Sequence, residues 1–183
     1  MTIPPSYSYL FIVGDSKSVA PANLWPAQLT VSIPGEWATS NVAVSGTDAS
    51  YWNTNIAAAL AAESHTQYAA LLNIGVNDLG TGISGATWIG YMEAVTDAIH
   101  AKWPSALVYI TRPWRRGYDT EADTMSGWID TVLADKSYTR AGPDERSWLK
   151  GGDNGTTNTG DGIHYSNAAE YVLAGLWKTI LGY

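Results

Sequence analysis

Short apolar runs alternate with helical patterns along the whole chain, and this alternation constrains the fold more than any other feature. Strands are predicted where apolar runs end in polar turns, at residues 7–13, 37–44, 68–74, 107–110 and, as a short fifth strand, 147–149. Because strands joined by helical crossovers pair in parallel and carry helices on both faces, the pattern predicts a three-layer α/β/α fold.

The segments between the strands have the apolar spacing and the end signals of helices. The predicted helices begin near residue 21, at Asp48 or Thr47, near 88, near 125 and after Ser166, and two of them end near Glu63 and before Pro104. The sequence shows no internal repeat and no linker. We therefore expect a single domain, residues 1–183, built on a flavodoxin-like parallel sheet of about five strands.

Polar residues stand where the apolar runs end. Ser16 follows the first predicted strand, Gly46 the second and Asn77 the third, and the loop before the last helix contains Asp161 and His164. Since the carboxyl ends of parallel strands lie at one edge of a sheet, we expect these residues to converge there. Each also has an ordinary structural interpretation, because serine and asparagine cap helices and glycine permits turns.

A serine that attacks an acyl carbon needs a base, and histidine is the usual one. The chain has three histidines. His65 precedes a strand, at the opposite edge of the sheet from the strand exits, and His100 ends an amphipathic helix. His164 lies in a polar loop at the expected active edge, where Asp161 could bind its Nδ1 atom, although the pair could also only stabilise a turn. The backbone N–H groups of Ser16 and Gly46 and the amide of Asn77 are candidate oxyanion donors.

The composition excludes several classes of function. The net charge of −7 argues against nucleic acid as a partner, and the only basic cluster, Arg112, Arg115 and Arg116, is large enough for one carboxylate or phosphate. Cysteine is absent, which excludes disulfides, thiolate chemistry and Cys-based zinc sites. No run is long enough for a membrane span, and no export signal is present, so we expect a cytoplasmic or already processed chain.

Four short blocks carry a resemblance to a known family. They are Gly14-Asp15-Ser16, Ser45-Gly46, Gly75-Val76-Asn77-Asp78 and Asp161-Gly162-Ile163-His164. In order and approximate spacing these blocks resemble those of the SGNH hydrolases, also called GDSL esterases, and most of all the small single-domain thioesterase I/lysophospholipase and arylesterase members. The resemblance implies that Ser16 is the nucleophile, that Gly46 and Asn77 complete the oxyanion hole, and that Asp161 and His164 complete the triad.

The chain departs from the family pattern beside two of these residues. Lys17 follows the serine where an apolar residue is usual, and Tyr165 follows the histidine where proline is common. Neither position performs chemistry, so the departures concern local packing and the charge of the pocket. Asp15 and Asp78 are expected to be structural.

The leading hypothesis is a serine esterase that cleaves short-chain acyl esters through an acyl-enzyme intermediate, without metal or organic cofactor. Its substrate would be a small-molecule ester or an acetylated carbohydrate, and Trp114, Arg115 and Ile163 are candidate contacts. Carbohydrate O-acetylesterase, thioesterase and lysophospholipase activities remain alternatives on the same fold. Loops 79–85 and 112–118 would decide among them.

Alternatives from other classes remain open. Nine tryptophans and eleven tyrosines also suit a non-catalytic carbohydrate-binding module. A nucleotide-binding domain fits less well, because the residues after the first strand match neither phosphate-loop pattern. Metal-dependent hydrolysis through Asp153, Asp161 and His164 is a weaker alternative. The oligomeric state is left open.

Overall fold

The computed structural model describes residues 7–19, 24–149 and 159–183. Its centre is a five-stranded sheet in which every neighbouring pair is parallel, in the order β2-β1-β3-β4-β5. The strands are β1 (Tyr7–Gly14), β2 (Glu36–Asn41), β3 (Ala69–Asn73), β4 (Leu107–Arg112) and β5 (Thr139–Asp144). This strand order is that of flavodoxin-like folds, so the predicted fold class is confirmed.

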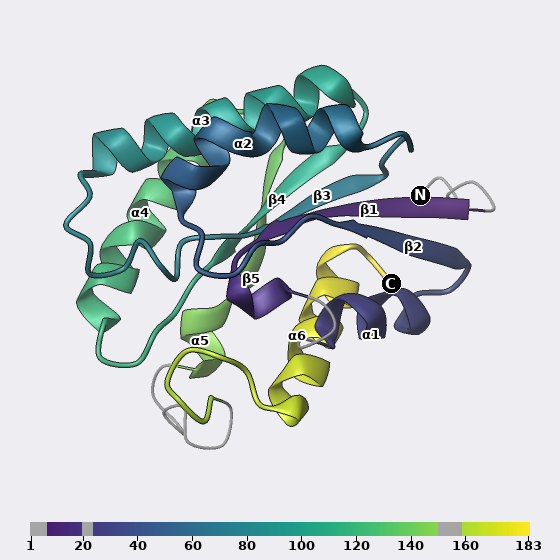
Figure 1. Ribbon diagram of the computed structural model, residues 1–183. Helices are drawn as coiled ribbons and strands as arrows, with labels where there is room; N and C mark the ends of the chain where they lie inside the picture. The colour runs from purple at the N-terminus through teal and green to yellow at the C-terminus, as the bar shows by residue number, and fades with distance from the viewer. Residues whose placement is uncertain (1–6, 20–23, 150–158) are drawn as a thin grey trace.

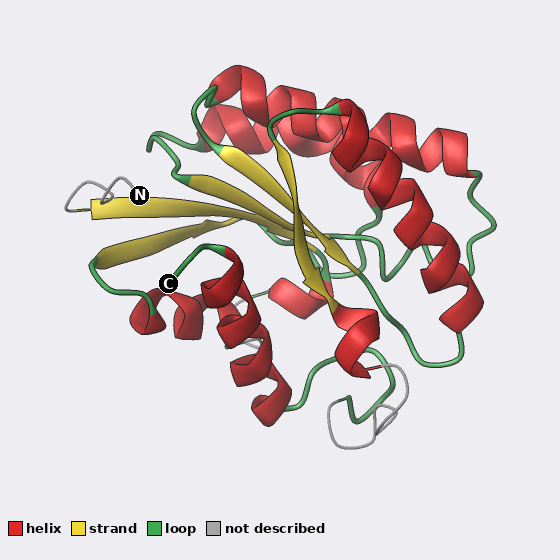
Figure 2. Cartoon of the chain, turned by 180° about the vertical axis from the view of Figure 1, so that it is seen from behind, coloured by secondary structure: helices red, strands yellow, loops and turns green. Residues whose placement is uncertain are grey.

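Helices cover both faces of the sheet, which gives the three expected layers (Figures 1 and 2). One face carries α2 (Ala49–Ala62), α3 (Gly85–Lys102) and α4 (Asp119–Asp135). The other carries α1 (Trp25–Ser32), the short α5 (Glu145–Leu149) and α6 (Asn167–Ile180). A single turn of 3₁₀ helix, η1 (Ser16–Ser18), follows β1.

The central strands are buried on both faces because helices lie above and below them. Every residue of β3 is buried, as the apolar composition of that segment predicts. Side chains cap three of the helices: Asp48 accepts a hydrogen bond from Tyr51 N, Ser84 from Thr87 N and Ser166 from Ala169 N. The expected caps at Asp48 and Ser166 are therefore confirmed.

The predicted fifth strand at residues 147–149 is wrong, because these residues belong to α5 and the fifth strand is Thr139–Asp144. That strand contains Gly142 and Pro143, which usually indicate a turn. An edge strand tolerates proline, and a Cβ at residue 142 would lie 2.9 Å from both the Ile110 carbonyl carbon and the Trp177 ring. Close packing therefore accounts for the glycine. The strand predicted at 37–44 also ends earlier, at Asn41.

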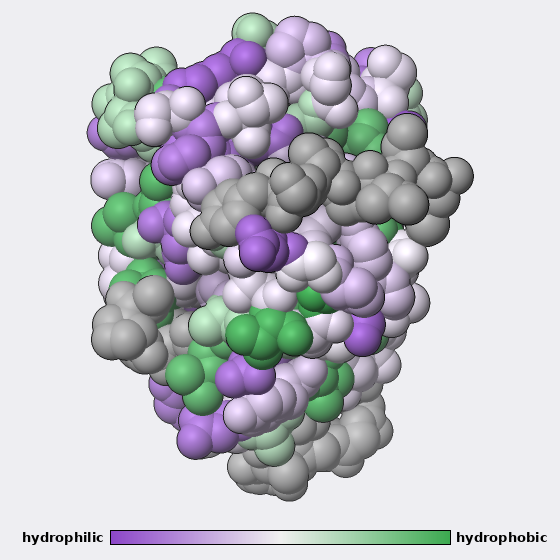
Figure 3. Space-filling model, turned by 90° about the vertical axis from the view of Figure 1, so that its right-hand side faces the viewer, coloured by the Kyte–Doolittle hydropathy of each residue, from purple (hydrophilic) through white to green (hydrophobic). Residues whose placement is uncertain are grey.

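The tryptophans pack into the interior. Six of the nine are buried and the other three, Trp37, Trp128 and Trp148, are half-buried. The face shown in Figure 3 has hydrophobic residues in small groups among polar ones. No tryptophan is fully exposed, which weakens the tryptophan part of the case for a carbohydrate-binding module, whereas Tyr51, Tyr68 and Tyr171 are exposed. Among the described helices, none has both the length and the apolar character of a membrane span.

Candidate active site

Ser16 lies in a tight turn at the carboxyl end of β1. Gly14 is the last residue of β1. A Cβ atom at residue 14 would lie only 2.7 Å from the Ser18 Oγ atom, so a residue with a side chain does not fit there. The Asp15 carboxylate accepts a hydrogen bond from Lys17 N over 2.9 Å and thereby caps η1. Asp15 is buried, and burial raises its pKa to about 7. The turn presents Ser16 half-exposed at the edge of the sheet.

His164 lies beside Ser16, although 148 residues separate them in sequence. Its Nε2 atom is 2.9 Å from Ser16 Oγ, and its Nδ1 atom is 2.6 Å from Asp161 Oδ2. The other Asp161 oxygen accepts hydrogen bonds from the backbone N–H groups of Ile163, at 2.9 Å, and His164, at 2.8 Å. The structure therefore brings the predicted serine, histidine and aspartate into one hydrogen-bonded chain.

The carboxylate of Asp161 is stabilised in its charged form. Partial burial by itself would raise its pKa, but the hydrogen bonds from the His164 side chain and from the backbone of His164 and Ile163 outweigh that effect. The pKa of Asp161 is held well below its ordinary value. An ionised carboxylate at this position orients the imidazole with Nδ1 protonated and Nε2 free to accept a proton.

Hydrogen bonds join the turns that follow β1, β2 and β3. The Thr47 hydroxyl donates to the carbonyl oxygens of Val44, at 2.8 Å, and Gly14, at 3.3 Å, which ties the Gly46 turn to the end of β1. Gly46 adopts a φ of +78°, a conformation that favours glycine. The side-chain amide of Asn77 donates to the Thr47 carbonyl oxygen over 2.8 Å. Gly46 and Asn77, the two predicted oxyanion donors outside η1, therefore lie in turns that are joined by a hydrogen bond.

The residue after Asn77 anchors this arrangement to the next helix. Both carboxylate oxygens of Asp78 accept a hydrogen bond from Ala49 N, at 3.2 and 3.3 Å, at the start of α2. Burial raises the pKa of Asp78 to about 6. Beyond it, a hollow of about 60 Å³ lies between the glycine-rich loop that follows β3 and the side of α4, lined in part by Leu79, Ile83 and Met125.

The loop after β4 differs from expectation. The sequence predicts Trp114 as an open substrate contact, but this residue is 3% exposed and its indole N–H donates to Asp119 over 2.7 Å. The side chain of Trp114 is therefore packed into the protein and is not open to a substrate in this structure. Arg115 lies with its guanidinium 4.6 Å from the centre of the Tyr118 ring and stays half-exposed. Ile163 is half-exposed between Asp161 and His164.

The three arginines of this segment do not form one anion site. Arg112 pairs with Asp130 and donates to the Ser126 carbonyl oxygen. Arg116 donates through its guanidinium to the Thr159 carbonyl oxygen over 2.9 Å and through its backbone N–H to the Gly162 carbonyl oxygen over 3.0 Å. It therefore supports the loop that carries Asp161 and His164.

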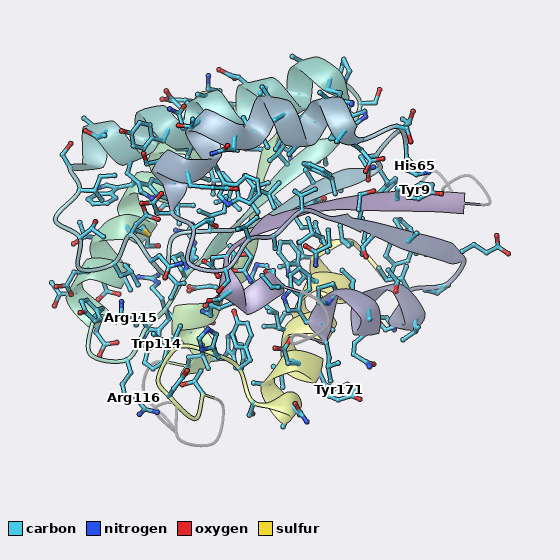
Figure 4. The ribbon with its side chains drawn as sticks, viewed as in Figure 1. Tyr9, His65, Trp114, Arg115, Arg116 and Tyr171 are labelled. Atoms are coloured by element: carbon cyan, nitrogen blue, oxygen red, sulfur yellow. The ribbon has the colours of Figure 1, made fainter. Side chains whose placement is uncertain are left out.

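The other two histidines lie outside this site. His65 stacks on Tyr9 and its Nδ1 atom is 2.7 Å from Glu63. Figure 4 shows Tyr9 and His65 at the opposite end of the sheet from Trp114, Arg115 and Arg116, as predicted for His65. His100 stacks on Tyr138 with 3.9 Å between ring centres.

No cluster of three or more metal-ligating side chains occurs within residues 7–19, 24–149 and 159–183. Asp153, the third member of the metal alternative, lies outside the described residues.

Sequence reasoning misses Glu145. This residue is fully buried, it forms an ion pair with Lys17, and it accepts a hydrogen bond from the Tyr165 hydroxyl. Burial, together with the charge of Glu145, raises the pKa of Tyr165 well above its ordinary value. The unusual Lys17 thus points into the interior, away from solvent. No local pattern marks Glu145, because its partners lie 128 and 20 residues away in sequence.

Comparisons with known proteins bear on the family and the fold. The profile of the GDSL-like lipase/acylhydrolase family matches residues 8–169. The crystal structure of TesA superposes with a TM-score of 0.80 at 21% identity, covering 96% of this chain and 98% of the other. The esterase EstA from Pseudoalteromonas sp., inhibited by monoethylphosphonate, gives a TM-score of 0.75 at 15% identity, with 96% and 100% covered.

A carbohydrate esterase family 3 structure from Talaromyces cellulolyticus gives a TM-score of 0.72 at 15% identity, with 95% of this chain and 96% of the other covered. No curated protein sequence matches the chain. At these identities the structural matches establish the fold.

Proposed function

The chain belongs to the GDSL-like lipase/acylhydrolase family, and from that premise we propose that it is a serine ester hydrolase that cleaves short-chain acyl esters through an acyl-enzyme intermediate. The observation that carries the proposal is the hydrogen-bonded chain from Ser16 Oγ to His164 Nε2, at 2.9 Å, and from His164 Nδ1 to Asp161 Oδ2, at 2.6 Å. A nucleophile, a base and an orienting carboxylate in this order are the requirement of serine hydrolysis.

The first half of the reaction forms the acyl-enzyme. Ser16 Oγ attacks the ester carbonyl carbon as its proton passes to His164 Nε2, and the carbonyl oxygen becomes an oxyanion. The imidazolium then gives that proton to the leaving alcohol oxygen as the C–O bond breaks. Asp161 stays ionised throughout and stabilises the imidazolium.

The second half repeats the first with water. His164 takes a proton from the water molecule, whose oxygen attacks the acyl carbon. A second tetrahedral oxyanion collapses, and the proton returns to Ser16 Oγ as the carboxylic acid leaves. Serine is regenerated, so no external reactant besides water is needed.

The oxyanion would be held by the backbone N–H groups of Ser16 and Gly46 and by the side-chain amide of Asn77. The link from Asn77 to the Thr47 carbonyl supports this assignment, because it uses one of the two amide hydrogens to orient the group. The second hydrogen can then point toward the developing charge. Donors that are oriented before the reaction stabilise a transition state most effectively.

One observation supports a short acyl group. The Leu79–Gly85 segment, which follows the Asn77 turn, offers few long apolar side chains with which to cover a lipid tail. Arg115 is half-exposed and adjoins Arg116, which contacts the loop of Asp161 and His164; a polar alcohol component, such as an acetylated sugar, would suit this segment.

The test is a series of p-nitrophenyl esters from acetate to dodecanoate, assayed with the wild-type chain and with Ser16→Ala. We expect kcat/KM to be highest for the shortest acyl groups and to be lost in the variant, whose circular dichroism should match that of the wild type. Acetate release from acetylated polysaccharide then distinguishes a sugar esterase from a general one. A preference for long acyl chains would contradict the substrate class, and activity of Ser16→Ala would contradict the mechanism.

A further inference from the structure

We propose that Glu145 is a positioning residue for the reaction: it holds the Ser16 turn and the His164 loop at their working separation by binding the side chain next to each. The inference rests on the proposed function, because it assigns a role in bringing the nucleophile and the base together. Glu145 does not touch Ser16 or His164 itself. It acts through Lys17 and Tyr165.

The contact to the nucleophile turn is made by Lys17. Its ammonium group pairs with Glu145 Oε2 and donates to the Trp114 carbonyl oxygen over 3.2 Å, and both charged side chains are 0% exposed. Lys17 is also the residue whose backbone N–H is bound by the Asp15 carboxylate in η1. The lysine therefore links the turn that presents Ser16 to the interior of the protein.

The contact to the histidine loop is made by Tyr165. Its hydroxyl group donates to Glu145 Oε1, and its ring centre lies 4.6 Å from the Lys17 ammonium. Its segment is also held by an isolated antiparallel bridge between Thr159 and Tyr165. Tyr165 is buried, whereas the adjacent His164 is exposed, so the tyrosine is the inward anchor of the loop that carries the base.

Glu145 itself is held in place from a third direction. It begins α5, directly after β5, and its Oε2 atom also accepts a hydrogen bond from Trp114 N over 3.2 Å. One buried carboxylate thus joins the exits of β1, β4 and β5 to the segment before α6. A buried ion pair held by these hydrogen bonds cannot rearrange without leaving an unpaired charge in the interior, which makes the junction rigid.

Rigidity at this point matters because Ser16 and His164 lie near the surface and are joined by one hydrogen bond of 2.9 Å. Misplacement of reacting groups by about 1 Å can reduce a rate by about 10². The junction also accounts for both departures from the family pattern, since Lys17 and Tyr165 meet on the same carboxylate. Lys17 binds one oxygen of the Glu145 carboxylate and Tyr165 binds the other.

The experiment compares Glu145→Gln and Tyr165→Phe with a matched control, Glu170→Gln. The first substitution would keep the shape of the side chain but remove the charge that pairs with Lys17. Glu170 is another buried carboxyl, 2% exposed, and it accepts a hydrogen bond over 3.0 Å from Trp25 N, at the start of α1. The readouts are kcat and KM on p-nitrophenyl acetate, with the folded fraction measured by circular dichroism.

We expect Glu145→Gln to lower kcat per folded chain by about 10- to 100-fold with KM within about twofold, from the cost of misplacing reacting groups. Tyr165→Phe should shift kcat in the same direction by less, and Glu170→Gln should leave it within about twofold. In a His164→Ala background, Glu145→Gln should not lower the residual rate further, because the contact that it positions is gone. If Glu145→Gln does not fold, Tyr165→Phe carries the test.

Three results would overturn the inference: wild-type kcat in both Glu145→Gln and Tyr165→Phe, an equal loss in Glu170→Gln, or an undiminished effect in the His164→Ala background. Failure of the proposed function is distinguishable from each of these. In that case the wild-type chain would hydrolyse none of the esters, or Ser16→Ala would hydrolyse them as well as the wild type.

Discussion

The side-chain amide of Asn77 donates a hydrogen bond to the Thr47 carbonyl oxygen over 2.8 Å, which fixes the direction of the amide beside the Gly46 turn. If the second amide hydrogen binds the oxyanion, Asn77→Ala should reduce kcat by roughly 10²–10³ and change KM little, since this donor acts mainly in the transition state. Steady-state kinetics on p-nitrophenyl acetate measure both quantities. A kcat within about threefold of wild type would remove Asn77 from the oxyanion hole.

The two adjacent arginines after β4 should respond differently to alanine. Arg116 holds the loop of Asp161 and His164 through the carbonyl oxygens of Thr159 and Gly162, whereas Arg115 lies over the Tyr118 ring. Arg116→Ala should therefore lower kcat about tenfold on a neutral ester through looser placement of the base. Arg115→Ala should leave kcat within about twofold. Equal effects of the two substitutions would contradict this division of roles.

The pH dependence of stability follows from the buried carboxyls. Burial raises the pKa of Glu170 from 4.5 to about 7. At a pH between these two values, the Glu170 carboxyl is ionised in the unfolded chain but still protonated in the folded chain. The free energy of unfolding therefore falls as the pH rises through this range. The pKa values of Asp15 and Asp78 are also raised by burial, to about 7 and about 6, and act in the same direction. Wild-type Tm should therefore be lower at pH 8 than at pH 5.

Glu170→Gln isolates one of these groups, because glutamine keeps an acceptor for Trp25 N and does not titrate. The Tm of the variant minus the Tm of the wild type should be a larger positive, or a less negative, number at pH 8 than at pH 4.5. The difference should amount to roughly 2–4 °C for each kcal/mol of linked free energy. Differential scanning calorimetry at the two pH values measures it, and a constant offset would show that Glu170 does not titrate across this range.

The sheet is predictable from sequence where local pattern and burial agree. The residues of β3 are apolar and buried on both faces, so the run of apolar residues is sufficient to identify the strand. The fifth strand is predicted at the wrong residues because the composition of β5 depends on contacts with residues far along the chain. Ile110 and Trp177 pack so closely against residue 142 that only glycine fits. Local propensity cannot contain that information.

The candidate site is predictable for a related reason. Ser16, Gly46 and Asn77 follow strands whose carboxyl ends share an edge, so topology alone brings them near one another. Glu145 and the inward direction of Lys17 are not predictable, because their contact depends on how α5 packs against η1. The burial of Trp114 escapes sequence reasoning in the same way, since its partner Asp119 begins the next helix.

The central claim is that Ser16 becomes covalently acylated, and an active-site-directed phosphonate tests it most directly. Intact mass spectrometry and peptide mapping after treatment with a fluorophosphonate should show one phosphonyl group per chain, on Ser16, with loss of esterase activity in proportion. Ser16→Ala should remain unmodified. The account would be contradicted if the wild-type chain hydrolysed esters yet carried the adduct at another residue or carried none.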